Sequence, residues 1–547
     1  MSLRESTSRQ SAALLALALL PPLLLAAVAL AMHVAGLSGV DAAAHAYKID
    51  QLRHSLGAIF WDSSWYGGTY SVVDYGPLYY LCALVVPGIV LVVLAAGSLP
   101  LLAHLYLRRT YGVTSYLPAA ALAVVLCLYL SNGQDPFLFA LALMMGALVL
   151  LAYKRPASAA LAAGLALFCN PLALVVGGVF LIADFIARPE LRRPYLIFLA
   201  WLTPFLAARG GLSLVFAERA AYLDDFDQIV RPLAFALAGA GLAWFSGKER
   251  RRHFVTLFLT YAVACLLALA VRPLPLGNNV NRLFMVFAVP LLLAAVPWRV
   301  AWRRLPGGRR LPLPLLGIAL VVVAGSSAWQ QLATPAGHMF LPPSPQAADA
   351  AFFAPALQWA GAHADAQHRV HVVALSKHWE AFYFPRAGYA ITRGWYRQED
   401  IIHNALFLPP HYDRETYVAW LRSMGVRYVF LPHAPLDFTS KGEPAILAGS
   451  PDFTVAAQLQ GWTVYELRRP GLLFGPASGT TGGARVLALG HRSAKLQVDG
   501  AGTYVLKVSW SPFWRLRAGA GRLSHAGGDW IQLKADGPGT YVLQFRV

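Results

Sequence analysis

Residues 39–81 hold the densest set of groups that can do chemistry. The acids Asp41, Asp62 and Asp74 occur there with His45 and Lys48. In a helix that begins near position 41, Asp41, His45 and Lys48 are spaced i, i+4 and i+7 and share one face. A carboxylate beside an imidazole can act as a general base on a hydroxyl group, and a lysine can meet a phosphate. The pattern therefore predicts a site with Asp41 as the base.

Aromatic residues in the same stretch offer flat surfaces. Trp65 and Tyr66 directly precede Gly67 and Gly68, and Tyr75 follows further along. Glycines let another molecule approach the backbone closely, and aromatic rings present apolar faces. We therefore expect Trp65, Tyr66 and Tyr75 to bind sugar rings. The plainer alternative is an aromatic belt at the membrane interface.

Positive charge occurs in the other loops that should lie on the same side of the membrane. Arg272 and Arg282 flank an asparagine-rich loop, and Arg219 lies in another. An anionic leaving group needs positive charge more than a general acid. Arg282 opens a predicted span and is our first candidate for a phosphate contact, with Arg272, Lys48 and Arg219 as further candidates. As alternatives, Arg282 anchors the span and Lys48 reaches toward the lipid headgroups.

A second cluster lies at residues 377–400. It contains His378, Trp379, Glu380, Arg393 and Trp395. Tryptophan stacks on sugar rings and arginine grips anions, so the cluster predicts acceptor binding. A docking surface is the alternative. For Asp41, the alternative is that its side chain only caps a helix starting at Ala42, and for His45 it is a packed interface position.

The amino-acid composition indicates the class of protein that must position these groups. The chain has 547 residues, of which 57% are hydrophobic and 13% charged, against about 25% charged in soluble proteins. This excludes a cytosolic enzyme, a secreted disulfide scaffold and a disordered regulator. The net charge of +18 comes from clusters at the ends of apolar runs, which is the positive-inside pattern and argues against nucleic-acid binding.

We therefore predict a polytopic α-helical membrane protein. Residues 1–10 form a cytoplasmic N-terminus, and residues 11–329 form a transmembrane domain with a long first extracytoplasmic loop, 37–77. Loops assigned to the cytoplasm hold 18 Lys and Arg residues and those outside hold 7, which places the C-terminus outside. The expected 11 spans lie near 11–35, 78–107, 114–131, 137–153, 157–170, 171–187, 194–210, 230–247, 253–271, 283–298 and 312–329. The pair at 157–187 is short, so a re-entrant hairpin is the alternative there.

The remainder of the chain is predicted to form an extracytoplasmic region with two parts. Residues 330–349 form a proline-containing linker. Residues 350–474 form an α/β domain, with buried strands at 371–375 and 426–431 and an amphipathic helix at 414–424 between them. Gly475–Gly483 is a second linker. Residues 483–547 alternate apolar and polar residues between glycine turns, which predicts a β-sandwich.

This layout resembles the GT-C superfamily of integral-membrane glycosyltransferases, which have a long first outside loop with an acid near the end of the first span. The loop motifs D-x-x-x-H, W-D-x-x-W-Y-G-G and Y-G-P-L-Y-Y, and the segment at 377–400, are similar to actinobacterial-type membrane proteins labelled as related to 6-pyruvoyl-tetrahydropterin synthase. No pterin chemistry is visible here.

The resemblance implies sugar transfer on the outer face of a bacterial plasma membrane. The donor would be a polyprenyl-phosphate sugar and the acceptor an envelope glycan or a lipid-linked acceptor, among membrane lipids. Asp41 matches the catalytic acid. Some members use a divalent cation, so Mg²⁺, Mn²⁺ and Ca²⁺ stay open as cofactors, with Asp62, Asp74 or His45 as the second acid or metal ligand. The alternatives are a lipid-linked-sugar transporter or flippase and a structural partner of an assembly complex.

Overall fold

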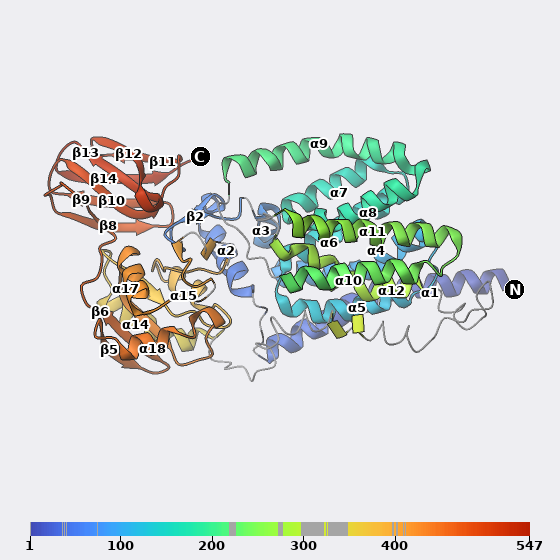
Figure 1. The fold of residues 1–547 in the computed structure, drawn as a ribbon, viewed down its shortest axis with the longest axis horizontal. Coiled ribbons are helices and arrows are strands. Elements are labelled where there is room, and N and C mark those ends of the chain that lie inside the picture. Colours follow the sequence, from blue (N-terminus) through green and yellow to red (C-terminus); the bar gives the residue numbers. More distant parts are fainter. Residues whose placement is uncertain are drawn as a thin grey trace. The chain divides into compact units, whose positions relative to one another are not determined.

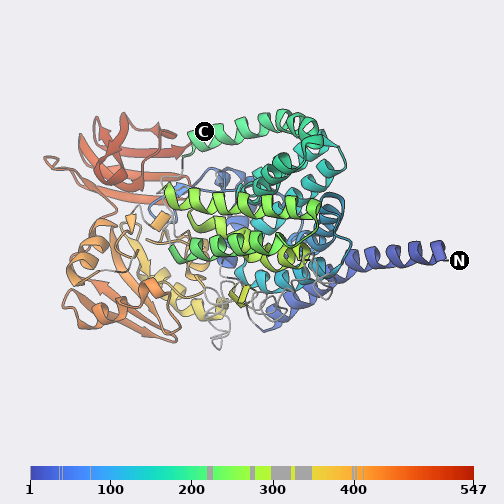
Figure 2. The ribbon, with the colours of Figure 1, turned by 45° about the vertical axis from the view of Figure 1, so that its right-hand side comes forward.

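Apolar runs broken by proline and polar turns form the helices of the N-terminal part. The protein is seen in a computed structural model that describes residues 2–35, 37, 39, 41–73, 75–217, 226–271, 277–296, 322–323, 325–326, 348–396, 399–400, 403–408, 410 and 412–547. The helices of this part lie side by side in one bundle (Figure 1, Figure 2). They are α1 (Ser2–Val34), α3 (Pro77–Val85), α4 (Gly88–Tyr111), α5 (Leu117–Tyr129), α6 (Asp135–Ala152), α7 (Pro156–Cys169), α8 (Leu172–Ala187), α9 (Arg192–Val215), α10 (Phe226–Ala243), α11 (Lys248–Ala270) and α12 (Arg282–Ala295).

Helix length supports a polytopic membrane protein. Within the described residues, five helical stretches are long and apolar enough to cross a membrane, and five more are apolar but shorter. The short ones include α7 and α8, with 14 and 16 residues, each shorter than the roughly 30 Å hydrocarbon core at 1.5 Å per residue. The predicted span at 312–329 lies almost wholly outside the described residues, so the count of 11 stays a prediction.

Proline decides where two helices break. The apolar run at 78–107 forms α3 and α4 instead of one helix, because Val86 is extended before Pro87, as a residue before proline prefers. Pro100 stays inside α4. Between α7 and α8, the Asn170 Oδ1 atom accepts a hydrogen bond from the Leu172 N–H at 3.0 Å, which starts the next helix.

The chain divides into two units. The first unit contains Met1–Gly39, Tyr75–Ala217 and Ala221–Leu341, and the second contains Val40–Asp74, Glu218–Ala220 and Pro342–Val547. Most of the long first loop therefore folds with the C-terminal part, whereas we expected it to belong to the transmembrane domain. Its tryptophans explain the difference, because Trp61 and Trp65 are core residues of the second unit.

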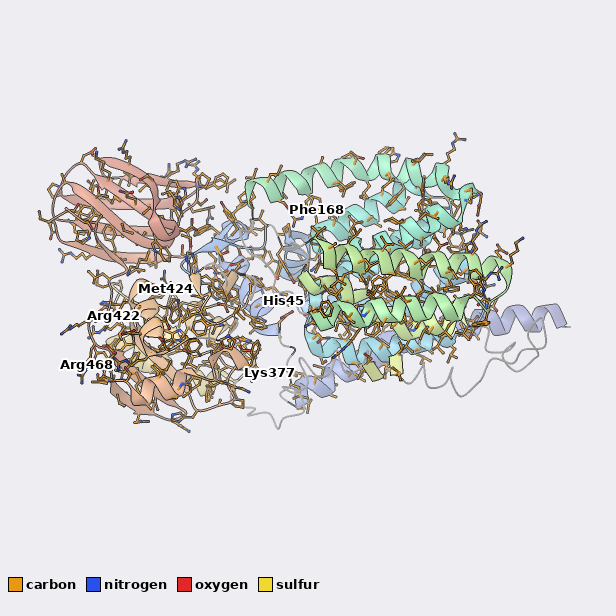
Figure 3. All side chains as sticks on the ribbon, viewed as in Figure 1. His45, Phe168, Lys377, Arg422, Met424 and Arg468 are labelled. Carbon is orange, nitrogen blue, oxygen red and sulfur yellow. The ribbon has the colours of Figure 1, made fainter. Side chains whose placement is uncertain are left out.

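The α/β part of the second unit has a four-stranded sheet in the order β3-β4-β6-β5. β3 (Arg369–Val372) and β4 (Val426–Pro432) are parallel, and β4 is antiparallel to β6 (Trp462–Leu467), which pairs with β5 (Phe453–Leu459). The helix and the second strand lie where they were predicted, whereas the first strand begins two residues earlier and ends three residues earlier than predicted. That helix is α17 (Arg414–Ser423), whose Arg422 donates to the Arg468 carbonyl at 3.2 Å. Both residues are labelled in Figure 3. The other helices are α14 (Ala350–His363), α15 (Glu380–Arg386) and α18 (Glu443–Gly449).

The C-terminal part is a sandwich of two four-stranded sheets, as predicted. The sheets have the orders β12-β13-β10-β7 and β11-β14-β9-β8. The strands are β7 (Phe474–Pro476), β8 (Ala484–Gly490), β9 (Ser493–Val498), β10 (Gly502–Ser509), β11 (Trp514–Ala518), β12 (Gly521–Ala526), β13 (Trp530–Ala535) and β14 (Gly539–Phe545). Because β7 belongs to a sheet, the sandwich begins before the glycine-rich stretch that we expected to be a linker.

The first loop contributes to both cores of this unit. It forms α2 (Ala42–His54) and a short hairpin of β1 (Trp61–Asp62) and β2 (Thr69–Tyr70). The Trp61 ring stacks on Phe545 of the sandwich, with centroids 4.8 Å apart. The Trp65 indole N–H donates to the Ala381 carbonyl of the α/β part at 2.9 Å. The loop is therefore a structural element of the second unit.

Candidate active site

Asp41 stands at the N-terminus of α2 but does not cap it. Its backbone occupies the cap position and its side chain makes no capping hydrogen bond. Instead, the Asp41 Oδ1 atom accepts a hydrogen bond from the Trp395 indole N–H at 2.9 Å. The interpretation of Asp41 as a simple helix cap is therefore wrong. The contact joins the first loop to the C-terminal cluster, 354 residues away in sequence.

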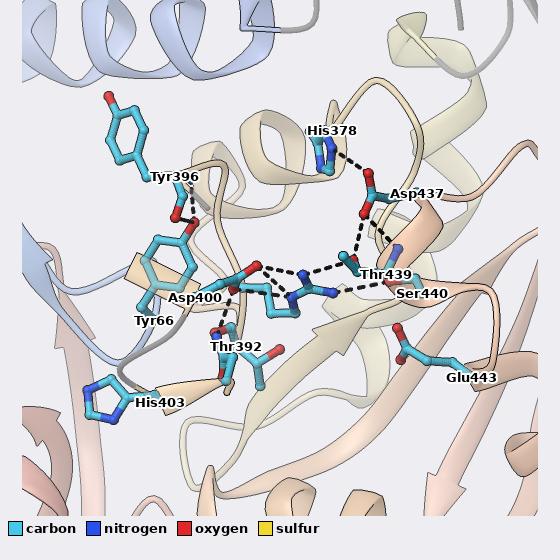
Figure 4. A network of polar contacts seen from close by, with 12 residues as sticks. Tyr66, His378, Thr392, Tyr396, Asp400, His403, Asp437, Thr439, Ser440 and Glu443 are labelled. Carbon is cyan, nitrogen blue, oxygen red and sulfur yellow. Dashed lines mark hydrogen bonds and ion pairs between the residues drawn. The ribbon is translucent and has the colours of Figure 1, made fainter. Parts of the chain in front are cut away.

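A buried histidine lies directly behind Trp395. The His378 ring stacks on Trp395 with centroids 3.5 Å apart and an interplanar angle of 13°. Its Nδ1 atom lies 3.3 Å from Glu380 Oε1. Its Nε2 atom lies 3.4 Å from Asp437 Oδ2, on the other side (Figure 4). Although burial alone would lower the pKa of His378, the Asp437 and Glu380 carboxylates raise it above its ordinary value. The imidazole, flanked by two carboxylates, thus lies on the face of the indole whose N–H donates to Asp41.

This ion cluster predicts a pH-dependent stability. His378 has a raised pKa, so the stability that its charge contributes is fully present below the unfolded value of about 6.5 and is lost as pH rises through the folded value. We expect the thermal unfolding temperature of the full chain to fall between pH 6 and pH 8. The window ends at pH 8 because burial lowers the pKa of Lys507 to about 8, and its deprotonation favours the folded state above that pH.

His378→Asn should flatten this fall. His378 has a φ of +55°, a conformation that asparagine adopts readily, so the variant removes the charge without backbone strain. His491, whose pKa is raised by Asp62, contributes in the same direction, and His491→Asn measures its share. An unfolding temperature that falls as steeply in His378→Asn as in the unchanged protein would show that His378 is neutral across the window.

Arg393 anchors the irregular segment that carries Trp395. Its guanidinium group pairs with Asp400, with Nη2 2.5 Å from Oδ2, and it also donates to Thr439 and Ser440 (Figure 4). Asp437 accepts from the Thr439 N–H at 3.0 Å, so one network joins Arg393 to the partner of His378. Arg393 is buried and engaged, which makes it a support for Trp395 in this structure.

A second buried histidine was not anticipated from the sequence. His371 lies between Thr392, 2.6 Å from Nδ1, and Glu443, 2.6 Å from Nε2. The order hydroxyl, imidazole, carboxylate is that of a nucleophilic triad. All three side chains are fully buried, so no substrate reaches Thr392 here. The arrangement links β3 to α18. Burial alone would raise the pKa of Glu443, but His371 and Arg393 lower it, so the buried carboxylate is stabilised by its neighbours.

Lys48 and Asp62 pair with each other. The Lys48 Nζ atom lies 2.9 Å from Asp62 Oδ2, and the two side chains are 1% and 0% exposed. Asp62 also accepts from the Ser64 N–H at 2.9 Å, and His491 lies 3.4 Å away. Although burial alone would raise the pKa of Asp62, Lys48 and His491 hold it well below its ordinary value. Neither group faces solvent, so the predicted phosphate and second-acid roles have no support here.

Removing one partner of this pair should destabilise the second unit strongly. Lys48→Met leaves the Asp62 carboxylate buried and without its cation, at a cost of about 3–5 kcal/mol of unfolding free energy. The double variant Lys48→Met with Asp62→Asn removes both charges and keeps an acceptor for the Ser64 N–H, so it should recover most of that loss. Denaturant unfolding of the full chain, followed by tryptophan fluorescence, measures both. If the double variant is as unstable as the single one, the pair is not what holds the hairpin.

The aromatic residues predicted to bind sugar differ in exposure. Trp65 and Tyr66 are buried, and the Tyr66 hydroxyl donates to the Tyr396 carbonyl at 3.1 Å. Tyr75 and Trp379 are only half-buried. His45, at 4% exposed, is also buried. Trp65 and Tyr66 thus present no open face in this structure, and the sugar-binding role of the group stays a prediction.

Arg282 donates hydrogen bonds to polar residues from two other parts of the first unit. Its Nε atom donates to Asn279 Oδ1 at 2.7 Å, and its Nη1 atom donates to Gln134 Oε1 at 2.8 Å. The guanidinium group lies over the Phe137 ring, 4.5 Å from the centroid. All of these residues lie in or next to loops that we expect on the outer side. Gln134 was not singled out in the sequence.

Some predicted residues lie outside the described part of the chain. These are Asp74, Arg219 and Arg272, whose roles stay predictions. Among the described residues, no group of three or more His, Cys, Asp or Glu side chains is arranged to hold a metal ion. Among the residues proposed as metal ligands, Asp62 is paired with Lys48.

No family description and no curated protein matches the chain. Among solved structures, the crystal structure of ArnT from Cupriavidus metallidurans in the apo state matches with 14% sequence identity and a TM-score of 0.38. The match covers 81% of this chain and 97% of that chain. This similarity is too low to assign a fold or an activity to the chain. The described helices and strands themselves define a polytopic membrane protein with a β-rich C-terminal part.

Proposed function

We propose that this protein is a membrane glycosyltransferase of the GT-C type. It transfers a sugar from a polyprenyl-phosphate donor to an envelope glycan or lipid-linked acceptor, on the extracytoplasmic face of a bacterial plasma membrane. Asp41 is the general base. The observation that carries the proposal is the Asp41 carboxylate, which leaves its own helix uncapped and is oriented instead by the Trp395 indole N–H at 2.9 Å.

The reaction is a single displacement. Asp41 accepts the proton of an acceptor hydroxyl, and the hydroxyl oxygen bonds to the anomeric carbon. The bond from that carbon to the phosphate oxygen breaks, and the lipid phosphate leaves with the electron pair. Because attack and departure occur on opposite faces of the sugar, the anomeric configuration inverts. The leaving group is an anion already, so it needs a cation rather than an acid.

Trp395 and His378 position the base. A carboxylate that accepts one fixed N–H bond keeps one orientation, and the stacked His378 keeps the indole in place. His378 is in turn fixed by Glu380 and Asp437. We assign Trp395, His378 and Glu380 to this support and Trp379, which is half-buried, to acceptor contact.

Arg282 is our candidate for the donor phosphate. Its Nε and Nη1 groups are held by Asn279 and Gln134, which fixes the guanidinium plane, as bidentate phosphate recognition requires.

The transporter alternative is weakened by Asp184. This acid is the main charge within the apolar helices, and it is 1% exposed. Its oxygens accept hydrogen bonds from the hydroxyls of Tyr106, Tyr111 and Tyr195 at 2.7, 3.1 and 2.9 Å. A carboxylate satisfied in this way ties α4, α8 and α9 together, and Asp184 itself is not an open charge for a passing headgroup.

The test is a reconstitution with two readouts. Purified protein in proteoliposomes is given a panel of radiolabelled polyprenyl-phosphate sugars and envelope-glycan acceptors, with and without a chelator. Sugar transfer to the acceptor and movement of donor between leaflets are measured in the same vesicles. Transfer supports the proposal. Donor movement without transfer supports a flippase, and neither activity supports a structural partner.

A further inference from the structure

Every Asp, Glu, Lys or Arg residue in the strands of the C-terminal sandwich is a Lys or an Arg. None of the eight strands β7–β14 contains Asp or Glu, and together they contain seven Lys and Arg residues. These are Arg485, Lys495, Lys507, Arg515, Arg517, Arg522 and Lys534. The three acids of this part, Asp499, Asp529 and Asp536, all lie between strands. A surface that only has to be soluble usually carries charges of both signs, whereas the strands here carry positive charge alone.

Four of these cations share the outer face of the sheet β11-β14-β9-β8. The register places Arg515 opposite Gln544, Val542 opposite Lys495, and Gln497 opposite Arg485. Alternate residues in these strands are buried in the sandwich core, so these positions point outward. Arg517 joins the same face, because its Nε atom donates to Gln544 at 3.1 Å. The four cations thus come from three of the four strands, β8, β9 and β11, and β14 contributes uncharged residues such as Gln544 between them.

This face, which we call the cationic sheet face (Arg485, Lys495, Arg515 and Arg517), is open. All four side chains are exposed. Among the described residues, none of them forms an ion pair with a carboxylate. Between them lie amide and hydroxyl groups such as Gln497 and Thr540, which are themselves hydrogen-bonded at 2.7 Å. Like charges held together without counter-charges favour binding of an anion.

The arrangement fits a polymer better than a membrane or a single phosphate. Neighbouring strands lie about 4.8 Å apart, so the charges form a row rather than converging on one point. A surface that inserts into lipid also needs exposed apolar side chains. Of residues 474–547, only Leu487 and Val547 are exposed large hydrophobic residues, and the interleaved amides and hydroxyls match the hydroxyl groups of a glycan.

We propose that the cationic sheet face binds an anionic polysaccharide of the cell envelope. This role is independent of the sugar transfer proposed above: it would hold an acidic polymer strand against the extracytoplasmic part through charge and hydrogen bonds. It requires no metal and no catalytic group.

The experiment uses the full chain in nanodiscs of neutral phosphatidylcholine. Binding of polygalacturonate, a polymer of uronic acids, is measured by titration at low and moderate salt, with neutral dextran and phosphatidylglycerol vesicles as comparison probes. Two variants each remove two exposed charges: Arg485→Gln with Lys495→Gln on the cationic sheet face, and Arg522→Gln with Lys534→Gln on the other sheet. Arg522 and Lys534 are directly opposite in register, which makes them a matched control.

We expect polygalacturonate binding that weakens with salt, no dextran binding, and a loss of about tenfold in affinity in Arg485→Gln with Lys495→Gln, given the strength of two exposed ion pairs. The matched control should change affinity by less than about twofold. Equal losses in both variants would show that only net charge matters and would overturn the proposal. Binding to the phosphatidylglycerol vesicles but not to the polymer would assign the face to lipid instead. Unchanged unfolding temperatures show that both variants fold.

Discussion

Asp41→Asn is expected to lower the rate of sugar transfer by about 10²- to 10⁴-fold, the range that one general base contributes. Asparagine keeps an oxygen that can accept the Trp395 N–H bond, which is 2.9 Å long, but it cannot take a proton from the acceptor. Donor affinity and the unfolding temperature should change little, because Asp41 makes no capping bond in α2. Initial rates and donor binding in the same proteoliposomes measure both quantities.

Trp395→Phe is the matched comparison for this result. It keeps an aromatic ring over His378, whose centroid lies 3.5 Å from that of Trp395, and removes only the N–H donor to Asp41. We expect kcat to fall about tenfold, as for one hydrogen bond to a charged group, with the donor KM unchanged. If Asp41→Asn transfers sugar at the rate of the unchanged protein, Asp41 is not the base, whatever Trp395→Phe does.

Arg282→Gln is expected to raise the donor KM by about 10- to 100-fold, which corresponds to the loss of one charge-assisted contact with phosphate. Arg282→Lys should restore little. A lysine keeps the charge but cannot donate to both Asn279 and Gln134, which Arg282 contacts at 2.7 and 2.8 Å, so its charge is not held in one place. Titration of transfer rate against donor concentration separates KM from kcat.

Arg155→Gln serves as the control for charge alone. Arg155 is exposed in a turn of the same unit that the charge pattern assigns to the cytoplasm, and its replacement should leave the donor KM unchanged. A similar rise in KM for Arg155→Gln and Arg282→Gln would mean that general surface charge attracts the donor. An unchanged KM in Arg282→Gln would move the phosphate site to Arg272 or Arg219.

Periodic apolar patterns made much of the fold predictable. The strands β3 and β4 and the helix α17 follow from short apolar runs and a helical repeat, and the sandwich follows from alternation. The packing of the first loop against the C-terminal sandwich could not be predicted from these patterns. Tryptophans at a membrane surface and tryptophans in a core have the same sequence signature, and only the fold shows Trp61 against Phe545.

The same limit applies to the candidate site. Asp41 and Trp395 could each be singled out by type, but their hydrogen bond joins segments that no local pattern connects. Lys48 was interpreted as a phosphate contact because its partner Asp62 lies beyond the end of α2, in β1, and no local pattern in the sequence pairs the two. Asp437, the acid beside His378, sits in a turn after β4 and resembles any solvated turn residue.

The anomeric configuration of the product tests the account most directly. Unlabelled donor of defined configuration is converted by the reconstituted protein, and the new glycosidic bond is assigned by NMR through its anomeric coupling constant. A single displacement with Asp41 as base predicts inversion relative to the donor. Retention would contradict it, because it requires a covalent intermediate or a second displacement for which Asp41 would be the nucleophile rather than the base.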